Sequence, residues 1–253
     1  MGGNVKRNGK LINISNTCTI DYYLLAFWYL SKIKKIFYQN ETNTQKVQII
    51  NEILISIENL NWERARELWT FEINNFNLEE NFNSISLFGS EYEKFFQHIS
   101  IFQRYNLIQR CKKTCIQNNK LIRDDSDNLF FKKINNRVVI YTGYNDKCHI
   151  CKINKNPRIK LKDNPDFLII QSINSNIYLN ELPKQFRIGK NIFPFLCATI
   201  HRRNHFIGIF EVNEELFVID DLDQSMTPLP SYDKNKPSHF YRYKTTLSLY
   251  FLI

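Results

Sequence analysis

The chain has 253 residues, of which 43% are hydrophobic and 14% aromatic, so it can bury the core of one large domain or two small ones. This composition excludes a disordered tail and a low-complexity array. The formal net charge is +9, which favours acidic partners but does not choose between nucleic acid, anionic lipid and an acidic protein.

The first half of the chain is predicted to be mostly helical. The stretch from Thr19 to Phe37 predicts a helix that is apolar on all sides as far as Leu30, as expected of a buried helix. Apolar residues at helical spacing predict further helices over 45–60 and 62–71, and another around residues 92–99.

The second half is predicted to form strands. Its apolar segments are short, rich in β-branched or aromatic residues and bounded by turn residues. They are NRVVIYTG (136–143), FLIIQSI (167–173), FPFLCATI (193–200), HFIGIFEV (205–212) and ELFVIDDL (215–222). A helical first half followed by a strand-rich second half indicates an α+β fold rather than an alternating α/β fold.

The six cysteines are interpreted through the expected compartment. No segment approaches the roughly 20 apolar residues that span a bilayer, and MGGNVKRNGK at the start lacks the apolar core of a secretion signal. We therefore expect a soluble protein of the cytoplasm or nucleus, with no membrane partner. In such a compartment cysteines indicate metal binding or catalysis rather than disulfides.

Four of the cysteines form two close pairs, Cys111 with Cys115 and Cys148 with Cys151. Two thiolates from each pair can complete the tetrahedron that zinc prefers, and His149 could replace one of them. A site closed by four thiolates leaves no open position for catalysis, so the predicted Zn²⁺ is structural. The alternative is four unrelated buried cysteines.

Cys18 stands at the expected start of the first helix, where the helix dipole stabilises a thiolate. A cysteine nucleophile also needs a base and a group that orients the base. The alternative is a small buried hydrophobe, which is our interpretation of Cys197 inside a predicted strand.

His205 is the candidate base, because it opens an apolar strand whose hairpin partner ends in Asp220 and Asp221. If residues 213–214 form a two-residue turn, Asp220 is the diagonal neighbour of His205 on the same face and Asp221 points away. A register shift of one residue would exchange the two carboxylates. The local geometry therefore suits a Cys-His-Asp triad.

The sequence resembles the ubiquitin-specific proteases. LINISNTCTIDYYLL (11–25) is similar to their Cys box, GLxNxGNTCYMNSxLQ. The matching residues are Leu11, Asn13, Asn16, Thr17, Cys18 and Leu24. Further similar segments are PDFLIIQ (165–171), NHFIG (204–208), FVIDD (217–221) and TTLSLYFLI (245–253). The order is Cys box, paired cysteines, strand, His box and Asp box, and it covers nearly the whole chain.

The resemblance implies one catalytic domain over 1–253 with a papain-like cysteine protease fold. Its parts would be a helical thumb (1–105), zinc-ribbon fingers (106–165) and a β-rich palm (166–253). The partner implied is ubiquitin or a ubiquitin-like protein, on its conjugates.

The resemblance also implies the chemistry. Cys18 would be the nucleophile, His205 the general base and Asp220 the orienting carboxylate. Asn13 would be an oxyanion donor, a role that only the resemblance implies. The reaction would be thiol-dependent isopeptide hydrolysis through a thioester.

Several residues depart from the family pattern and indicate a divergent branch, nearer the SUMO-cleaving relatives. The departures are Ser15, Thr19, Asp21, Tyr22, Leu25 and Asn204. The basic charge suits an acidic modifier such as SUMO. Two rival functions stay open: a catalytically inactive domain that binds the modifier, and a zinc-ribbon protein that binds nucleic acid.

Overall fold

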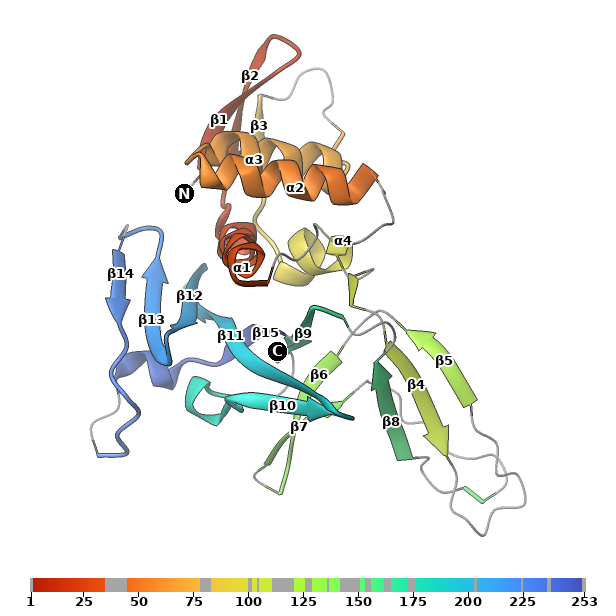
Figure 1. The fold of residues 1–253 in the computed structure, drawn as a ribbon. Coiled ribbons are helices and arrows are strands. Elements are labelled where there is room, and N and C mark those ends of the chain that lie inside the picture. Colours follow the sequence, from red (N-terminus) through yellow and green to blue (C-terminus); the bar gives the residue numbers. More distant parts are fainter. Residues whose placement is uncertain are drawn as a thin grey trace. The chain divides into compact units, whose positions relative to one another are not determined.

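The computed structural model describes most of the chain (Figure 1). The described residues are 2–34, 45–77, 83–99, 102–103, 105–110, 121–125, 129–135, 137–141, 151–152, 156–161, 165–172, 176–202, 204–223, 225–235 and 238–251. The chain forms two compact units: unit 1 comprises residues 1–98, 203–208 and 218–227, and unit 2 comprises the rest. The predicted boundaries of thumb, fingers and palm stay predictions.

Unit 1 holds the helices. They are α1 (Cys18–Lys34), α2 (Gln45–Glu58) and α3 (Trp62–Leu68), followed by the π-helical turns η1 (Trp69–Ile73) and η2 (Tyr92–Phe96), the latter extended by the start of α4 (Gln97–Ile99). The predicted helices over 45–60 and 62–71 are confirmed, and the first helix begins one residue earlier than predicted. Residues 35–37 of that prediction lie outside the described residues. No helix in the described ranges is long and apolar enough to cross a membrane.

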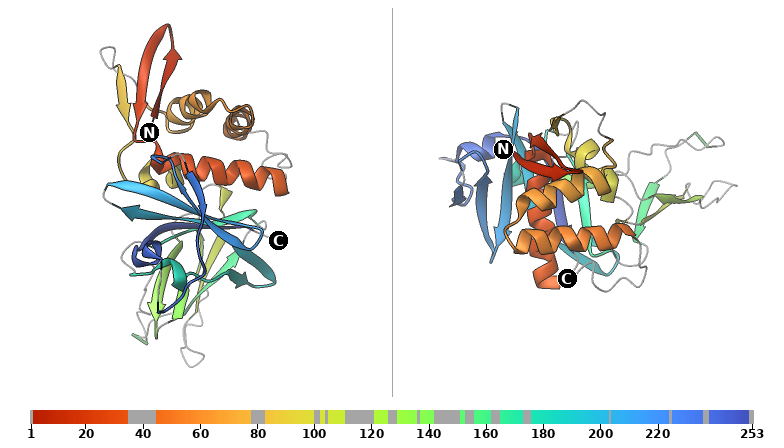
Figure 2. Two further views of the ribbon diagram at one scale, coloured as in Figure 1. Left: turned by 90° about the vertical axis from the view of Figure 1, so that its left-hand side faces the viewer. Right: turned by 90° about the horizontal axis from the view of Figure 1, so that it is seen from above.

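The chain begins with a hairpin that the sequence analysis missed. Strand β1 (Gly2–Arg7) pairs antiparallel with β2 (Lys10–Ser15), and β3 (Ser84–Ser86) lies parallel to β2 (Figure 2). Asn8 and Gly9 form the turn, with φ of 50° and 79°. Asn-Gly is the strongest short-range signal for a two-residue hairpin turn, so the polar start did carry the information.

Aromatic side chains form the core of unit 1. Trp69 of η1 stacks on Phe95 of η2 with ring centroids 4.5 Å apart, and Tyr23 and Phe27 of α1 pack on the same Phe95 ring. The indole Nε1 of Trp69 also donates to the Lys94 carbonyl at 3.0 Å. These contacts fix α1 against both π-helical turns.

A large sheet contains the predicted strands. Within the described residues its order is β14-β13-β12-β11-β15-β9-β6-β7, and β10 pairs with β11. The strands are β6 (Leu129–Ile134), β7 (Arg137–Tyr141), β9 (Phe167–Gln171), β10 (Gln185–Ile188), β11 (Asn191–Arg202), β12 (His205–Val212), β13 (Glu215–Asp220), β14 (Ser225–Pro228) and β15 (Thr245–Phe251). All five strands predicted over 136–222 are confirmed.

The predicted hairpin turn after β12 is also confirmed. Asn213 and Glu214 separate β12 from β13 and have φ of 52° and 68°. A turn with positive φ at both residues matches the right-handed twist of the flanking strands. It fixes which residues of the two strands meet at their far ends, where His205 and Asp220 stand.

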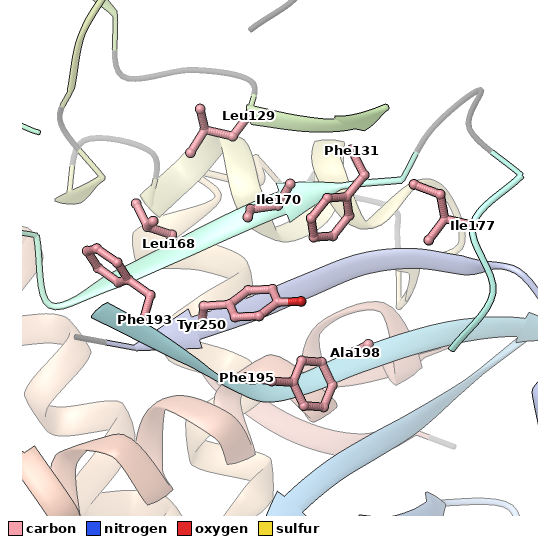
Figure 3. Packing of buried hydrophobic residues seen from close by; sticks show 9 residues of the cluster. All are labelled: Leu129, Phe131, Leu168, Ile170, Ile177, Phe193, Phe195, Ala198 and Tyr250. Carbon is pink, nitrogen blue, oxygen red and sulfur yellow. The ribbon is translucent and has the colours of Figure 1, made fainter. Parts of the chain in front are cut away.

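The core of unit 2 is an apolar cluster formed by strands of the large sheet (Figure 3). Its buried members are Leu129, Phe131, Leu168, Ile170, Ile177, Phe193, Phe195, Ala198 and Tyr250. The Tyr250 ring contacts those of Phe131, Phe186 and Phe195, and its hydroxyl donates to the Pro183 carbonyl at 3.0 Å. This hydrogen bond satisfies the one polar atom of the cluster's side chains.

A separate small sheet lies in the predicted fingers, with the order β5-β4-β8. Its strands are β4 (Tyr105–Arg110), β5 (Leu121–Asp125) and β8 (Asn156–Leu161). Both neighbours run antiparallel to β4: Gln109 pairs with Leu121, and Arg110 pairs with Asn156. The end of β4 and the beginnings of β5 and β8 therefore meet at one end of this sheet.

Candidate active site

Cys18 begins α1 and is 7% exposed. The chain leaves β2 and enters the helix through Asn16, whose φ of 56° is left-handed, a conformation that asparagine tolerates better than most residues. The Thr17 carbonyl accepts the N–H groups of Ile20 and Asp21, both at 2.9 Å. The thiol is thus held at the positive end of a buried helix.

His205 lies between two carboxylates. Its Nε2 is 2.9 Å from Asp220 Oδ1 and 3.2 Å from Asp221 Oδ1. Asp220 is within reach, as the hairpin register predicts, but the prediction that Asp221 points away is wrong. Because β13 ends at Asp220, Asp221 belongs to the following turn, where strand alternation no longer sets the direction of the side chain.

Tyr22 connects α1 to this acidic pair. Its hydroxyl donates to Asp221 Oδ1 at 2.9 Å and accepts the Asp221 backbone N–H at 3.2 Å. Tyr22 is 2% exposed and stands one helical turn after Cys18, on the same face of the helix. Sequence reasoning missed this role, and the only signal was that a tyrosine replaces the serine of the resembled family.

The thiol of Cys18 lies beside the strand that carries His205. Burial raises the pKa of the Cys18 thiol, the backbone N–H of Phe206 lowers it by donating to the sulfur, and the charges of Asp221 and Asp21 raise it further. Phe206 directly follows His205 in β12. All of these residues belong to unit 1, so Cys18, His205 and both carboxylates meet within one compact unit.

Asp21, in the first turn of α1, forms an ion pair with Arg66 of α3. Arg66 of α3 donates from Nε to Asp21 Oδ1 at 3.0 Å and from Nη2 to Asp21 Oδ2 at 2.8 Å. The Thr17 hydroxyl donates to the same Oδ2 at 2.5 Å. The side chains of Asp21 and Arg66 are 8% and 13% exposed, so the pair is largely removed from water.

Asn13 is exposed on β2, five residues before Cys18. Its side-chain nitrogen donates to Asn4 Oδ1 on β1 at 3.0 Å, and its backbone N–H donates to the Asn83 carbonyl at 2.9 Å. These bonds anchor Asn13 to the neighbouring chain segments. Its role as an oxyanion donor stays a prediction.

The predicted zinc ligands Cys111, Cys115 and Cys148 lie outside the described residues, as does His149. Cys151 is partly exposed in a turn. Strand β4 ends directly before Cys111, and β5 and β8 begin at the same end of the small sheet. The zinc site stays a prediction.

A second group could also hold a cation. His205, Asp220 and Asp221 each offer one ligand atom, and these atoms lie within 4.8 Å of one another. A cation there would have to displace the proton through which Nε2 of His205 bonds Asp220. The hydrogen-bonded arrangement is the one that the structure contains.

A cavity of about 600 Å³ lies elsewhere, within unit 2. Its lining includes Tyr232, Tyr241 and Glu211, and burial raises the pKa of the Glu211 carboxyl. Glu214 and Glu215, at the turn of the β12–β13 hairpin, also line it. His205 and Asp220 occupy the opposite end of that hairpin, so this cavity does not contain the triad.

Comparison with known proteins places this geometry in a structural context. No family model matches the chain, and no curated protein matches it by sequence. Among solved structures, it is similar to the SAGA DUB module Ubp8/Sgf11/Sus1/Sgf73 bound to monoubiquitin, with a TM-score of 0.51 and 13% identity, over 100% of this chain and 71% of that one. The fold is of the ubiquitin-specific-protease and papain-like type.

Two other solved structures are similar to the same degree. The papain-like protease of MERS Coronavirus matches with a TM-score of 0.50 and 8% identity, over 100% of this chain and 68% of that one. An essential yeast splicing factor matches with a TM-score of 0.50 and 11% identity, over 100% of this chain and 73% of that one. At such identities the similarity shows the fold, and the chemistry has to be argued from the site.

Proposed function

We propose that this chain is a cysteine isopeptidase that removes ubiquitin or a ubiquitin-like modifier, SUMO included, from protein conjugates. The observation that carries the proposal is the hydrogen bond between His205 Nε2 and Asp220, beside a cysteine at the start of a buried helix. A nucleophile, a base and an orienting carboxylate are the parts that acyl transfer through a thioester requires. The papain-like fold supports the same reaction.

The orientation of His205 supports one order of proton transfers in the proposed reaction. Because Nε2 of His205 faces the carboxylates, Nδ1 is the ring nitrogen that takes the proton of the Cys18 thiol. The thiolate sulfur attacks the isopeptide carbonyl carbon, and His205 returns the proton to the leaving lysine amine as the C–N bond breaks. Water then attacks the thioester, with His205 as base, and releases the modifier and the thiol.

The negative oxygen formed during attack needs hydrogen-bond donors. The N–H groups of Cys18 and Thr19 come before those that the Thr17 carbonyl accepts, and they lie at the positive end of the helix dipole. Asn13 is the second proposed donor. Its side-chain nitrogen has two N–H groups, and only one is needed for the bond to Asn4.

The test is a panel of ubiquitin and ubiquitin-like proteins, each with an electrophile at its C-terminus. We expect a covalent adduct with at least one modifier on the tryptic peptide of residues 11–32, in which Cys18 is the only cysteine. Cys18→Ala is expected to form none, and Cys197→Ala is the matched control that should still react. If no modifier probe forms an adduct, the proposal that the chain is a cysteine isopeptidase is wrong.

The second candidate is a domain that binds the modifier without cleaving it. The altered Cys box and the burial of Cys18 favour it. Saturable binding of a modifier without an adduct would support this candidate. The nucleic-acid-binding alternative rests on the net charge of +9 and on Lys112 and Lys113 beside the first cysteine pair. It requires salt-dependent binding of DNA or RNA without any adduct.

We also propose a structural zinc held by Cys111, Cys115, Cys148 and Cys151. It would tie the connections around β4, β5 and β8 together and would take no part in the reaction. One zinc per chain is expected by elemental analysis, and Cys148→Ser should lose it. An unchanged zinc content in Cys148→Ser would contradict this ligand set.

A further inference from the structure

The first turn of α1 contains a buried carboxylate close to the proposed nucleophile. Asp21 follows Cys18 by three residues, which places both on neighbouring positions of the same helix face. A carboxylate removed from water is strongly destabilising unless it is paired and hydrogen-bonded. A negative charge beside Cys18 also opposes the formation of the thiolate.

Arg66 satisfies this carboxylate. Its Nε and Nη2 bond the two oxygens of Asp21 at 3.0 and 2.8 Å, and this bidentate arrangement fixes both the direction and the charge of the pair. The Thr17 hydroxyl donates a further hydrogen bond to Asp21 Oδ2, and Arg66 Nη1 donates to the Gly2 carbonyl at 3.3 Å. One arginine of α3 therefore connects the start of α1 to the strand β1.

The neighbouring Arg64 has a different role. It bonds Glu67 at 2.9 Å on its own helix and Glu52 on α2 at 3.1 Å, and its side chain is 41% exposed. Both arginines belong to the seven-residue α3, and Arg66 is the one whose side chain hydrogen-bonds the helix that carries Cys18 within the described ranges. The short helix thus has one arginine for the packing of helices on the surface and one directed at the proposed active site.

We propose that Arg66 is a positioning residue of the active site: its ion pair with Asp21 holds the first turn of α1 in place and cancels a negative charge that would otherwise lie beside the Cys18 thiolate. The proposal rests on the proposed function, in which Cys18 is the nucleophile. The other charged groups that act on the thiol are Asp221, which raises its pKa, and the N-terminal amine, which lowers it. His205, on the adjacent strand β12, adds a positive charge when it is protonated.

The test measures the rate at which iodoacetamide alkylates Cys18 between pH 5 and 10, followed by the mass of the tryptic peptide of residues 11–32. Below the pKa of the thiol, its thiolate fraction falls tenfold per pH unit. Burial raises the pKa of the Asp21 carboxyl and Arg66 lowers it, so the charge acts on Cys18 only above that pKa. In that pH range we expect Arg66→Met to raise the pKa of the Cys18 thiol and to slow alkylation about tenfold. Asp21→Asn should lower the pKa and accelerate the reaction, because Arg66 then stands unopposed.

The double variant Asp21→Asn with Arg66→Met removes both charges, and we expect its rate to return to within about threefold of the unchanged protein. Arg64→Met, which removes a charge from the same helix, should leave the rate unchanged. A purely structural role would slow or accelerate both single variants alike. Identical pKa values in Asp21→Asn and the unchanged protein, with an unaltered circular dichroism spectrum, would overturn the proposal.

If Arg66→Met alone does not fold, the alkylation rates of Asp21→Asn and of the double variant still test the proposal. Asp21→Asn must react faster, because it keeps the positive charge of Arg66 that the double variant lacks. Equal rates in these two would count against the proposal. Alkylation needs no modifier, so it tests the role of Arg66 independently of the modifier probes, which test the isopeptidase activity. A shifted Cys18 pKa without a modifier adduct would support the charge effect and reject only the enzyme.

Discussion

The first turn of α1 and the apolar cluster of unit 2 are both well buried, but they consist of opposite chemistry. Thr17 and Asp21 are 0% and 6% exposed and are held by directional hydrogen bonds and an ion pair. Phe131 and Leu168, at 2% and 0%, are held by dispersion and by the removal of apolar surface from water. A packed apolar cluster contributes stability, whereas a buried ion pair contributes little net stability and sets position and charge.

This difference predicts that the two regions respond to substitution in separate ways. Changes near Cys18 should mainly alter reactivity, and changes in the cluster should mainly alter the free energy of unfolding. The following variants test whether reactivity and the free energy of unfolding respond independently in the two regions.

The largest effect is expected at His205. His205→Ala removes the base, and we expect the rate of reaction with a modifier probe to fall about a thousandfold. The free energy of unfolding should change by less than about 1 kcal/mol, because the side chain is 15% exposed at the start of a strand. His201→Ala, on the exposed end of β11, is the control and should retain the rate. A comparable loss of rate in His205→Ala and His201→Ala would show that the loss does not come from removal of the base.

Phe131 tests the other region. Phe131→Ala leaves a cavity among Phe186, Tyr250 and their neighbours, so we expect the free energy of unfolding in urea to fall by about 3–5 kcal/mol. The probe reaction of the folded protein should stay within about twofold. Phe130→Ala, at the half-buried adjacent position of β6, should cost less than half as much. A large loss of reactivity in folded Phe131→Ala would mean that the two regions are coupled.

The smallest effects sharpen the assignment within the site. Asp220→Asn keeps the shape but removes the charge that orients His205, so we expect a loss on the order of a hundredfold in the probe reaction. Asp221→Asn keeps an oxygen that can accept the Tyr22 hydroxyl, and about a threefold loss is expected. The reverse order of the two losses would assign the third triad position to Asp221.

Much of the fold was predictable because its signals are local. The alternating and β-branched segments predicted β12 at its observed bounds and β13 from its observed start, although the predicted segment extended beyond Asp220, where β13 ends. The two-residue turn between the strands predicted that Asp220 meets His205. The β1–β2 hairpin carried an equally local Asn-Gly signal, and Ile12 and Ile14 of β2 alternate with polar residues. It was missed because Val5 is the one apolar residue of β1, so that strand shows no alternation by itself.

The partners of the site residues were less predictable because they are distant in sequence. Arg66 is 45 residues from Asp21, and Tyr22 is 199 residues from Asp221. Neither pair has a fixed spacing that a motif could encode. Asp221 itself was assigned to the wrong side because strand alternation was extended one residue beyond the end of β13.

The sequence by itself determined the helices α1 to α3, the five strands predicted over 136–222, the turn between β12 and β13, and the candidates Cys18, His205 and Asp220, because each depends on periodicity or turn chemistry within a few residues. Only the tertiary structure decided that Asp221 also faces His205, that Tyr22 ties it to α1, and that Arg66 neutralises Asp21. Side-chain hydrogen bonds between distant segments depend on how helices and strands pack. That packing is a property of the whole chain, which no local pattern contains.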